Sequence, residues 1–197
     1  KSFADDRASL SATIYRVNWD GMPVRISPPC GFSFALNAGR ARSEGVELEL
    51  RTILSENVRL DITTSYGESK LKEDIPLSSD FGSDGDNLPG SADFNVSLGL
   101  EYLFSFAGHN MLARADYSYV GDYYHNFSET GQSSGGYSQL NLKGSLDLDE
   151  FDIEIFVNNI TNANEFTWVE TSLNAFGAHR AYRLRPRTVG VNLSYSF

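Results

Sequence analysis

Residues 189–197, at the end of the chain, alternate bulky apolar side chains with small or polar ones and finish on the aromatic Phe197. Successive side chains of a β-strand point to opposite faces, so this pattern predicts a strand with one apolar and one polar side. Chain termini usually fray into solvent, and an apolar terminal strand is unusual in a soluble domain. A strand of this kind instead suits a wall between hydrocarbon and water, because about 9–11 residues span a membrane as a tilted strand.

The same two-residue period recurs along the whole chain and predicts an all-β, antiparallel fold. In residues 93–104, for example, one face holds Phe94, Val96, Leu98, Leu100, Tyr102 and Phe104, and the other holds Asn95, Ser97, Gly99 and Glu101. The predicted strands are 8–19, 42–53, 57–67, 93–104, 110–120, 137–146, 151–160 and 184–197. Only the first strand is irregular: Leu10 and Ile14 imply one apolar face, whereas Tyr15 and Trp19 imply the other, which predicts a bulge between the two pairs.

The connections between these strands alternate in length. The short ones are residues 54–57, 105–109 and 147–150, and the long ones follow Asp20, Gly67, Val120 and Ile160. In an up-and-down sheet every long loop therefore leaves from the same end, as in outer-membrane barrels with short periplasmic turns. The alternative is a soluble sandwich or barrel with a dry core, which alternation alone does not separate from a membrane barrel. The loop asymmetry and the terminal Phe197 favour the membrane barrel.

Composition is consistent with such a barrel. Apolar residues make up 41% of the chain and the mean hydropathy is −0.31, because lumen-facing polar residues dilute lipid-facing ones in a barrel strand. The net charge of −10 argues against a nucleic-acid partner. The single cysteine, Cys30, excludes a disulfide within the chain. Residues 1–6 lack the apolar segment of a signal peptide, so we expect a mature chain or one whose beginning lies elsewhere.

Five stretches resemble the β-barrel of TonB-dependent outer-membrane receptors. In chain order they are residues 37–50 (NAGRARSEGVELEL), 87–92 (NLPGSA), 115–124 (ADYSYVGDYY), 156–162 (FVNNITN) and 185–191 (RPRTVGV). Ser91 and Ala92 stand where the family more often has a proline. The ending also resembles the closing strand of outer-membrane barrels, whose final aromatic residue helps the assembly machinery to recognise the chain. This resemblance implies that Tyr195 and Phe197 form an assembly signal.

The resemblance implies an antiparallel up-and-down transmembrane β-barrel in the outer membrane of a Gram-negative bacterium. Residues 1–197 would supply about eight C-terminal strands of a barrel of about 22, without the N-terminal plug domain. The implied function is active transport of a scarce ligand, most often a ferric siderophore, with cobalamin and sugar as the open alternatives. Energy would be relayed by the TonB complex to the plug, and no cofactor is implied. Further implied partners are the barrel-assembly machinery, outer-membrane lipid and lipopolysaccharide. The alternative is a self-contained eight-stranded outer-membrane barrel with a structural or adhesive role.

Loop aromatics and charges are the candidate ligand contacts, because they could stack on and pair with an anionic chelate. They are Tyr123, Tyr124, His125, Phe127, Trp168, Phe176, His179 and Arg180. The alternative is a set of solvated loops with incidental aromatics. A basic run follows, formed by Arg180, Arg183, Arg185 and Arg187, which would meet lipopolysaccharide phosphates or pair with carboxylates of neighbouring strands.

No catalytic or metal site is predicted. The serines lack a nucleophile motif, the histidines lack a spacing that suggests a shared metal, and Asp80, Asp84 and Asp86 lack the spacing of an EF-hand calcium loop. We therefore expect a protein that is not an enzyme.

Overall fold

The computed structural model describes residues 2–3, 7–26, 32, 34–75, 82–127, 129, 132–169 and 180–196. The strands are β1 (Ser2–Phe3), β2 (Ala8–Ile26), β3 (Phe34–Ser55), β4 (Val58–Leu71), β5 (Phe94–Phe106), β6 (His109–Val120), β7 (Tyr137–Leu148), β8 (Phe151–Asn158), β9 (Phe166–Val169), β10 (Ala181–Arg183) and β11 (Thr188–Tyr195). Among the described residues, no helix has the length and apolar character needed to cross a membrane.

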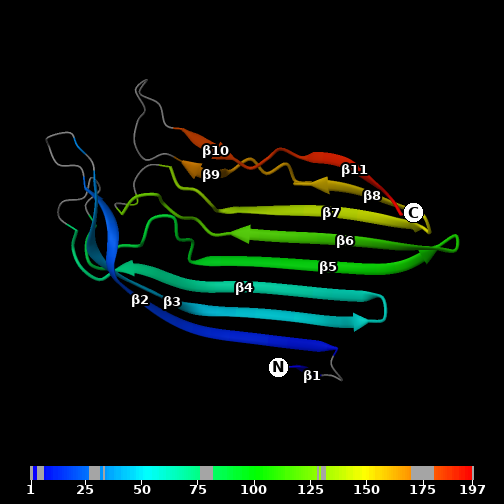
Figure 1. Ribbon diagram of the computed structural model, residues 1–197, viewed down its shortest axis with the longest axis horizontal. Helices are drawn as coiled ribbons and strands as arrows, with labels where there is room; N and C mark the ends of the chain where they lie inside the picture. Colours follow the sequence, from blue (N-terminus) through cyan, green and yellow to red (C-terminus); the bar gives the residue numbers. More distant parts are fainter. Residues whose placement is uncertain are drawn as a thin grey trace.

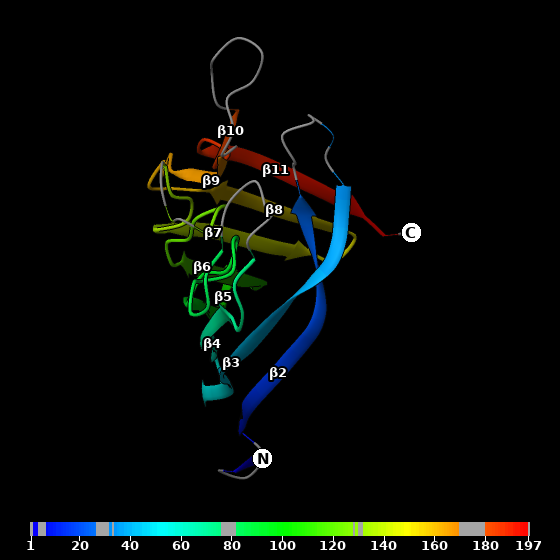
Figure 2. The same ribbon diagram turned by 90° about the vertical axis from the view of Figure 1, so that its left-hand side faces the viewer.

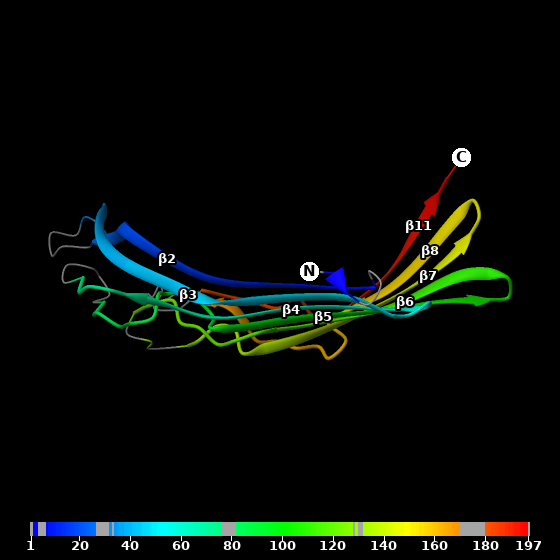
Figure 3. The same ribbon diagram turned by 90° about the horizontal axis from the view of Figure 1, so that it is seen from below.

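The main sheet has nine antiparallel strands in the order β1-β2-β3-β4-β5-β6-β7-β8-β11, and β9 pairs with β10 in a separate two-stranded sheet. Figure 1 shows the tight turns and the C-terminus at one end and the long connections at the other. The strands bend into a trough (Figure 3), and the sheet follows an arc when it is seen from the long-loop end (Figure 2). Within the described residues the two edges of the sheet do not pair. The predicted all-β, up-and-down architecture is confirmed, as part of a barrel.

Strand registry places apolar and charged side chains in alternate rows across the sheet. Leu50 pairs with Ile62, which pairs with Leu98 on β5. One residue away along the strands, Arg51 pairs with Asp61, which pairs with Gly99. Because neighbouring residues of a strand face opposite sides, the first row lies on one face and the second row on the other.

The apolar face carries exposed side chains on strands across the sheet. Ile14 is 85% exposed and Leu193 is 73% exposed, and an apolar surface that follows a sheet in this way suits surrounding hydrocarbon. Aromatic side chains lie at both ends of this face, with Phe151 and Tyr195 4.9 Å apart at the short-turn end. We call this the outer face and the charged side the lumen face.

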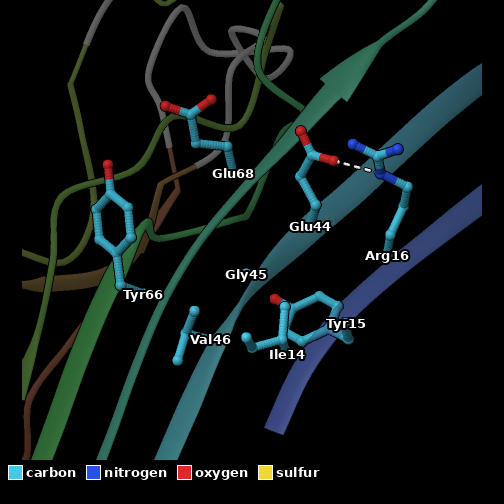
Figure 4. A pocket seen from close by; sticks show the side chains of 8 residues that line it. All are labelled: Ile14, Tyr15, Arg16, Glu44, Gly45, Val46, Tyr66 and Glu68. Carbon is cyan, nitrogen blue, oxygen red and sulfur yellow. Dashed lines mark hydrogen bonds and ion pairs between the residues drawn. The ribbon is translucent and has the colours of Figure 1, made fainter.

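The apolar band of the outer face ends at one row of residues. Ile14, Val46 and Tyr66 form its last row on β2, β3 and β4, and the next outward row holds Arg16, Glu44 and Glu68. Arg16 Nε donates to Glu44 Oε2 over 2.6 Å. These two rows line an open groove of about 660 Å³ (Figure 4). The change from apolar to charged residues marks where β2–β4 rise above the hydrocarbon.

Two sequence predictions were wrong in this region. The long connection expected after Asp20 is largely strand, because β2 continues to Ile26 and β3 begins at Phe34. The bulge expected between Ile14 and Tyr15 is absent: the β2–β3 register is continuous from Ala8 to Asp20 and shifts only beyond it. Above the hydrocarbon both faces of the sheet meet water or loops. The apolar side chains of β2 therefore move from one face to the other after Ile14, although the strand has no bulge there. Cys30 lies outside the described residues.

Candidate ligand site at the long-loop end

A loop layer covers the lumen face at the long-loop end. Its small apolar core consists of Met22, Ala41, Leu71 and Ile75, with Leu88 and Phe127 packed against them. The connection after β4 and the connection after β6 are tied together, since Gly90 N donates to Tyr124 O over 2.7 Å and Asn87 Nδ2 donates to Glu129 Oε1 over 2.6 Å. The two loops therefore form one packed layer.

Four aromatic rings follow one another across this layer, and we call them the aromatic row: Tyr123, His125, Trp168 and Tyr182. The ring centroids lie 5.2 Å apart for Tyr123 and His125, 5.9 Å for His125 and Trp168, and 5.4 Å for Trp168 and Tyr182. The first two rings come from the connection after β6, whereas Trp168 lies on β9 and pairs with Tyr182 on β10. Residues from two distant connections thus form one continuous aromatic surface.

Hydrogen bonds hold the two connections together beneath the row. The Tyr123 hydroxyl donates to the Thr167 carbonyl over 2.9 Å, and Gly135 N donates to Phe166 O over 3.0 Å. His125 Nε2 lies 2.9 Å from the hydroxyl of the buried Ser134. The row is therefore positioned by direct bonds and not only by ring contacts.

Burial favours the neutral forms of two members of the aromatic row. Burial raises the pKa of Tyr123, and burial lowers the pKa of His125. Burial has this effect because it disfavours the charged form of each group. A cation lies beside the row: the Arg183 guanidinium is 4.0 Å from the centroid of the Phe166 ring. The site thus offers aromatic faces next to one fixed positive charge, which suits a planar or anionic ligand.

A polar cavity of about 150 Å³ adjoins the row at Tyr123. Its lining consists of Asn87, Leu88, Ser91, Asp93, Asp122, Tyr123, Tyr124, Asn126 and Glu129. Burial, followed by the nearby Glu68, raises the pKa of Asp93. Ligand pockets are commonly about 300–1,000 Å³, so this cavity admits only part of a ligand.

The lumen face below the layer carries an ionic network. Arg114 on β6 bonds to Asp116 over 2.7 Å and lies 3.6 Å from Glu101 and 3.8 Å from Asp61. Glu101 also pairs with Arg59 over 3.1 Å. Charged side chains are costly in contact with lipid but not in contact with water, so this network identifies the face as the one that meets the aqueous lumen.

The structure brings together three of the residues predicted from sequence, Tyr123, His125 and Trp168. Tyr124 lines the adjacent cavity, whereas Phe127 packs against the apolar core of the loop layer. Arg180 is described and exposed. Phe176 and His179 lie outside the described residues, as does Phe197.

Sequence reasoning missed Tyr182, Phe166 and Arg183. Arg183 was assigned only to a basic run, and its contact with Phe166 depends on the pairing of β9 with β10. The available signal was weak: Phe166 and Trp168 alternate with smaller residues as in a short strand. In the described part of the chain, no three His, Cys, Asp or Glu side chains are placed to hold a common metal ion.

Comparison with known families agrees with this geometry. A family model described as TonB dependent receptor-like, beta-barrel, matches residues 1–162. A comparison with curated proteins gives no match.

Solved structures share the fold at low sequence identity. The ferric yersiniabactin uptake receptor FyuA of Yersinia pestis matches with a TM-score of 0.80 and 20% identity, over 97% of this chain and 28% of its own. The siderophore receptor PiuA of Acinetobacter baumannii matches with a TM-score of 0.72 and 20% identity, over 98% and 26%. The copper transporter OprC matches with a TM-score of 0.74 and 18% identity, over 98% and 29%. The chain thus spans less than a third of the length of these proteins.

Proposed function

Because this chain belongs to the TonB-dependent receptor β-barrel family, we propose that it forms the C-terminal part of an outer-membrane receptor that takes up a scarce ligand by active transport. The proposed ligand is a ferric siderophore or a similar anionic chelate. Residues 1–197 supply barrel wall and outer loops in this proposal, and a plug domain elsewhere in the receptor couples transport to the TonB complex.

The aromatic row is the observation that supports a ligand-binding role most directly. It lies at the long-loop end of a sheet whose outer face is apolar and whose lumen face is ionic. In an outer-membrane barrel the long loops are extracellular, so the row would be the first surface that an external ligand meets. Aromatic faces with the nearby Arg183 complement a chelate that carries aromatic rings and negative charge.

The other ligand contacts predicted from the sequence also have a place in this proposal. Tyr124 contributes to the cavity, and Arg180, Phe176 and His179 belong to the same connection as Trp168 and Tyr182. The proposal involves binding and release without covalent chemistry, so the receptor is not an enzyme in this account. Outer-membrane lipid, lipopolysaccharide and the barrel-assembly machinery are its further proposed partners.

Growth and binding test this proposal together. A deletion strain carrying the intact receptor should grow on particular ferric chelates as sole iron source, and growth should require the TonB complex. In the purified receptor, the double substitution of Trp168→Ala and Tyr182→Ala should weaken binding of the supported chelate about tenfold, since each ring contact contributes about 0.5–1.5 kcal/mol.

The matched control is Phe106→Ala, which removes an exposed aromatic ring at the short-turn end and should leave affinity unchanged. Growth that is the same with and without the receptor on every ferric chelate would overturn the iron-chelate assignment. Uptake that persists without the TonB complex would overturn the transport mechanism.

A further inference from the structure

Asn159 is a buried polar residue at the base of the connection that carries Trp168 and Tyr182. It follows the last residue of β8, the residue is 1% exposed, and its φ of 52° lies in the left-handed region. Asparagine tolerates this region better than most residues. A buried amide with an unusual backbone angle indicates a position at which this side chain has a specific task.

The Asn159 side chain joins the two ends of the connection. Its Nδ2 donates to the carbonyls of Ala163 and Arg185, both over 2.8 Å. Its Oδ1 accepts from Ala163 N over 2.9 Å, and its backbone N donates to Asn141 Oδ1 on β7 over 2.8 Å. One side chain therefore ties residue 163 to residue 185 and anchors both beside the sheet.

Further bonds close the same base. Arg187 N donates to Asn162 Oδ1 over 3.0 Å, Leu184 N donates to Glu165 O over 3.1 Å, and Arg183 Nη1 donates to Asn164 O over 2.6 Å. The next residues along the two arms form β9 and β10. The pairing that sets Trp168 against Tyr182 is thus built directly on the junction made by Asn159.

We propose that Asn159 is a positioning residue for the aromatic row: it closes the base of residues 159–187 and so fixes Trp168 and Tyr182 beside His125. The role needs two N–H donors and an acceptor on one short side chain, a combination that asparagine supplies and aspartate does not. An effect on ligand affinity rests on the proposed function, whereas the closure of the base is a property of the fold and can be measured without a ligand.

Two substitutions at Asn159 separate the contribution of its side-chain hydrogen bonds from that of its backbone conformation. Asn159→Asp keeps the size and the acceptor but places a carboxylate oxygen against the carbonyls of Ala163 and Arg185. Asn159→Gly accepts the positive φ and keeps the backbone bond to Asn141, but it has no side-chain bonds. The control is Asn110→Asp, the same chemical change at an exposed position in the opposite, short-turn end of the sheet.

The measurements are hydrogen–deuterium exchange of the intact receptor in detergent and binding of a ferric catecholate chelate. Both Asn159 variants should retain heat-modifiable barrel migration. Backbone amides of residues 163–169, 181–185 and 187 should exchange about tenfold faster or more in both variants, because Asn159→Asp loses the two bonds donated by Nδ2 and Asn159→Gly loses the bond to Oδ1 as well. If the wild-type receptor binds the chelate, both variants should bind it about tenfold more weakly. Asn110→Asp should match the wild type in every measurement.

Unchanged exchange in Asn159→Asp and Asn159→Gly would overturn the proposal whatever the binding result. Wild-type affinity for the chelate in variants with faster exchange would also overturn it, since the row would not depend on the closed base. Faster exchange together with a wild-type receptor that binds no chelate would leave the closure of the base established and count against the proposed function instead.

Discussion

The hydroxyl oxygen of Tyr15, on β2, lies 2.6 Å from the position that a Cβ atom at Gly67, on β4, would occupy. Between them stands Gly45 on β3, which pairs with both residues across the sheet. The Tyr15 side chain therefore reaches across Gly45, with its hydroxyl beside both paired glycines, and links three strands. Figure 4 shows Tyr15 and Gly45 on neighbouring strands. A large side chain beside glycine backbone fills the space that the missing side chains leave, where β2–β4 pass from the hydrocarbon into the loop region.

Alanine at Gly67 should destabilise this junction, and removal of the Tyr15 hydroxyl should relieve part of the effect. The added methyl would meet the hydroxyl at 2.6 Å, whereas the nearest backbone atom, Glu44 O, lies at 3.0 Å. We expect Gly67→Ala to cost about 1–3 kcal/mol and Tyr15→Phe combined with it to cost less. Urea unfolding in lipid vesicles measures both.

Gly45→Ala is the matched comparison for that pair of variants. A Cβ there would lie 2.5 Å from the Tyr66 carbonyl oxygen, which is backbone and cannot move away cheaply. Tyr15→Phe should therefore fail to rescue Gly45→Ala. Equal rescue at both glycines would show that the Tyr15 hydroxyl is not what limits Gly67.

Leu98 and Ser97 are neighbours on β5 that test which face meets lipid. Leu98 lies in the apolar row with Ile62, whereas Ser97 lies on the lumen face. Leu98→Arg should impair assembly in the outer membrane, because a charge at mid-bilayer on the lipid face costs about 2–4 kcal/mol. Ser97→Arg should assemble normally. Heat-modifiable migration in gels reports both, and equal behaviour of the two variants would contradict the assignment of faces.

His125 should make the loop layer sensitive to acid. Burial lowers its pKa in the folded protein, so the contribution of the neutral ring is fully present above the ordinary histidine value of roughly 6.5. This contribution to the free energy of unfolding should be lost as pH falls from that value through the lowered pKa, because in this range the unfolded state binds more protons than the folded state. Proton NMR of histidine-labelled protein, with His125→Gln to identify the resonance, measures the pKa. A pKa at or above the ordinary value would contradict the prediction.

Removal of Phe197 should reduce the amount of receptor inserted into the outer membrane more than it reduces the stability of inserted receptor. The resemblance to outer-membrane closing strands motivates this expectation, and Tyr195 on β11 already packs against Phe151 at 4.9 Å. Outer-membrane yield and the urea midpoint of inserted protein separate the two effects. An unchanged yield would speak against Phe197 as an assembly signal.

The central strands were predictable because their pattern is local. The predicted segment 110–120 falls within β6, and the predicted segment 93–104 begins one residue before β5 and otherwise falls within it, since every second side chain there meets lipid and the others meet the lumen. The same reasoning failed for β2 and β3 beyond Asp20, where the pattern is no longer set by one apolar and one polar surrounding.

The alternation of the sequence, together with its unequal connection lengths, determined an up-and-down sheet with one apolar and one polar face, because strand geometry repeats every two residues. It also identified aromatic residues in the long connections as candidate contacts. Only the tertiary structure decided which of them meet: Tyr123, His125 and Trp168 converge with Tyr182, while Phe127 enters the apolar core of the loop layer. Loops have no repeating geometry, and their positions depend on single long-range bonds, such as those of Asn159, that no local pattern encodes.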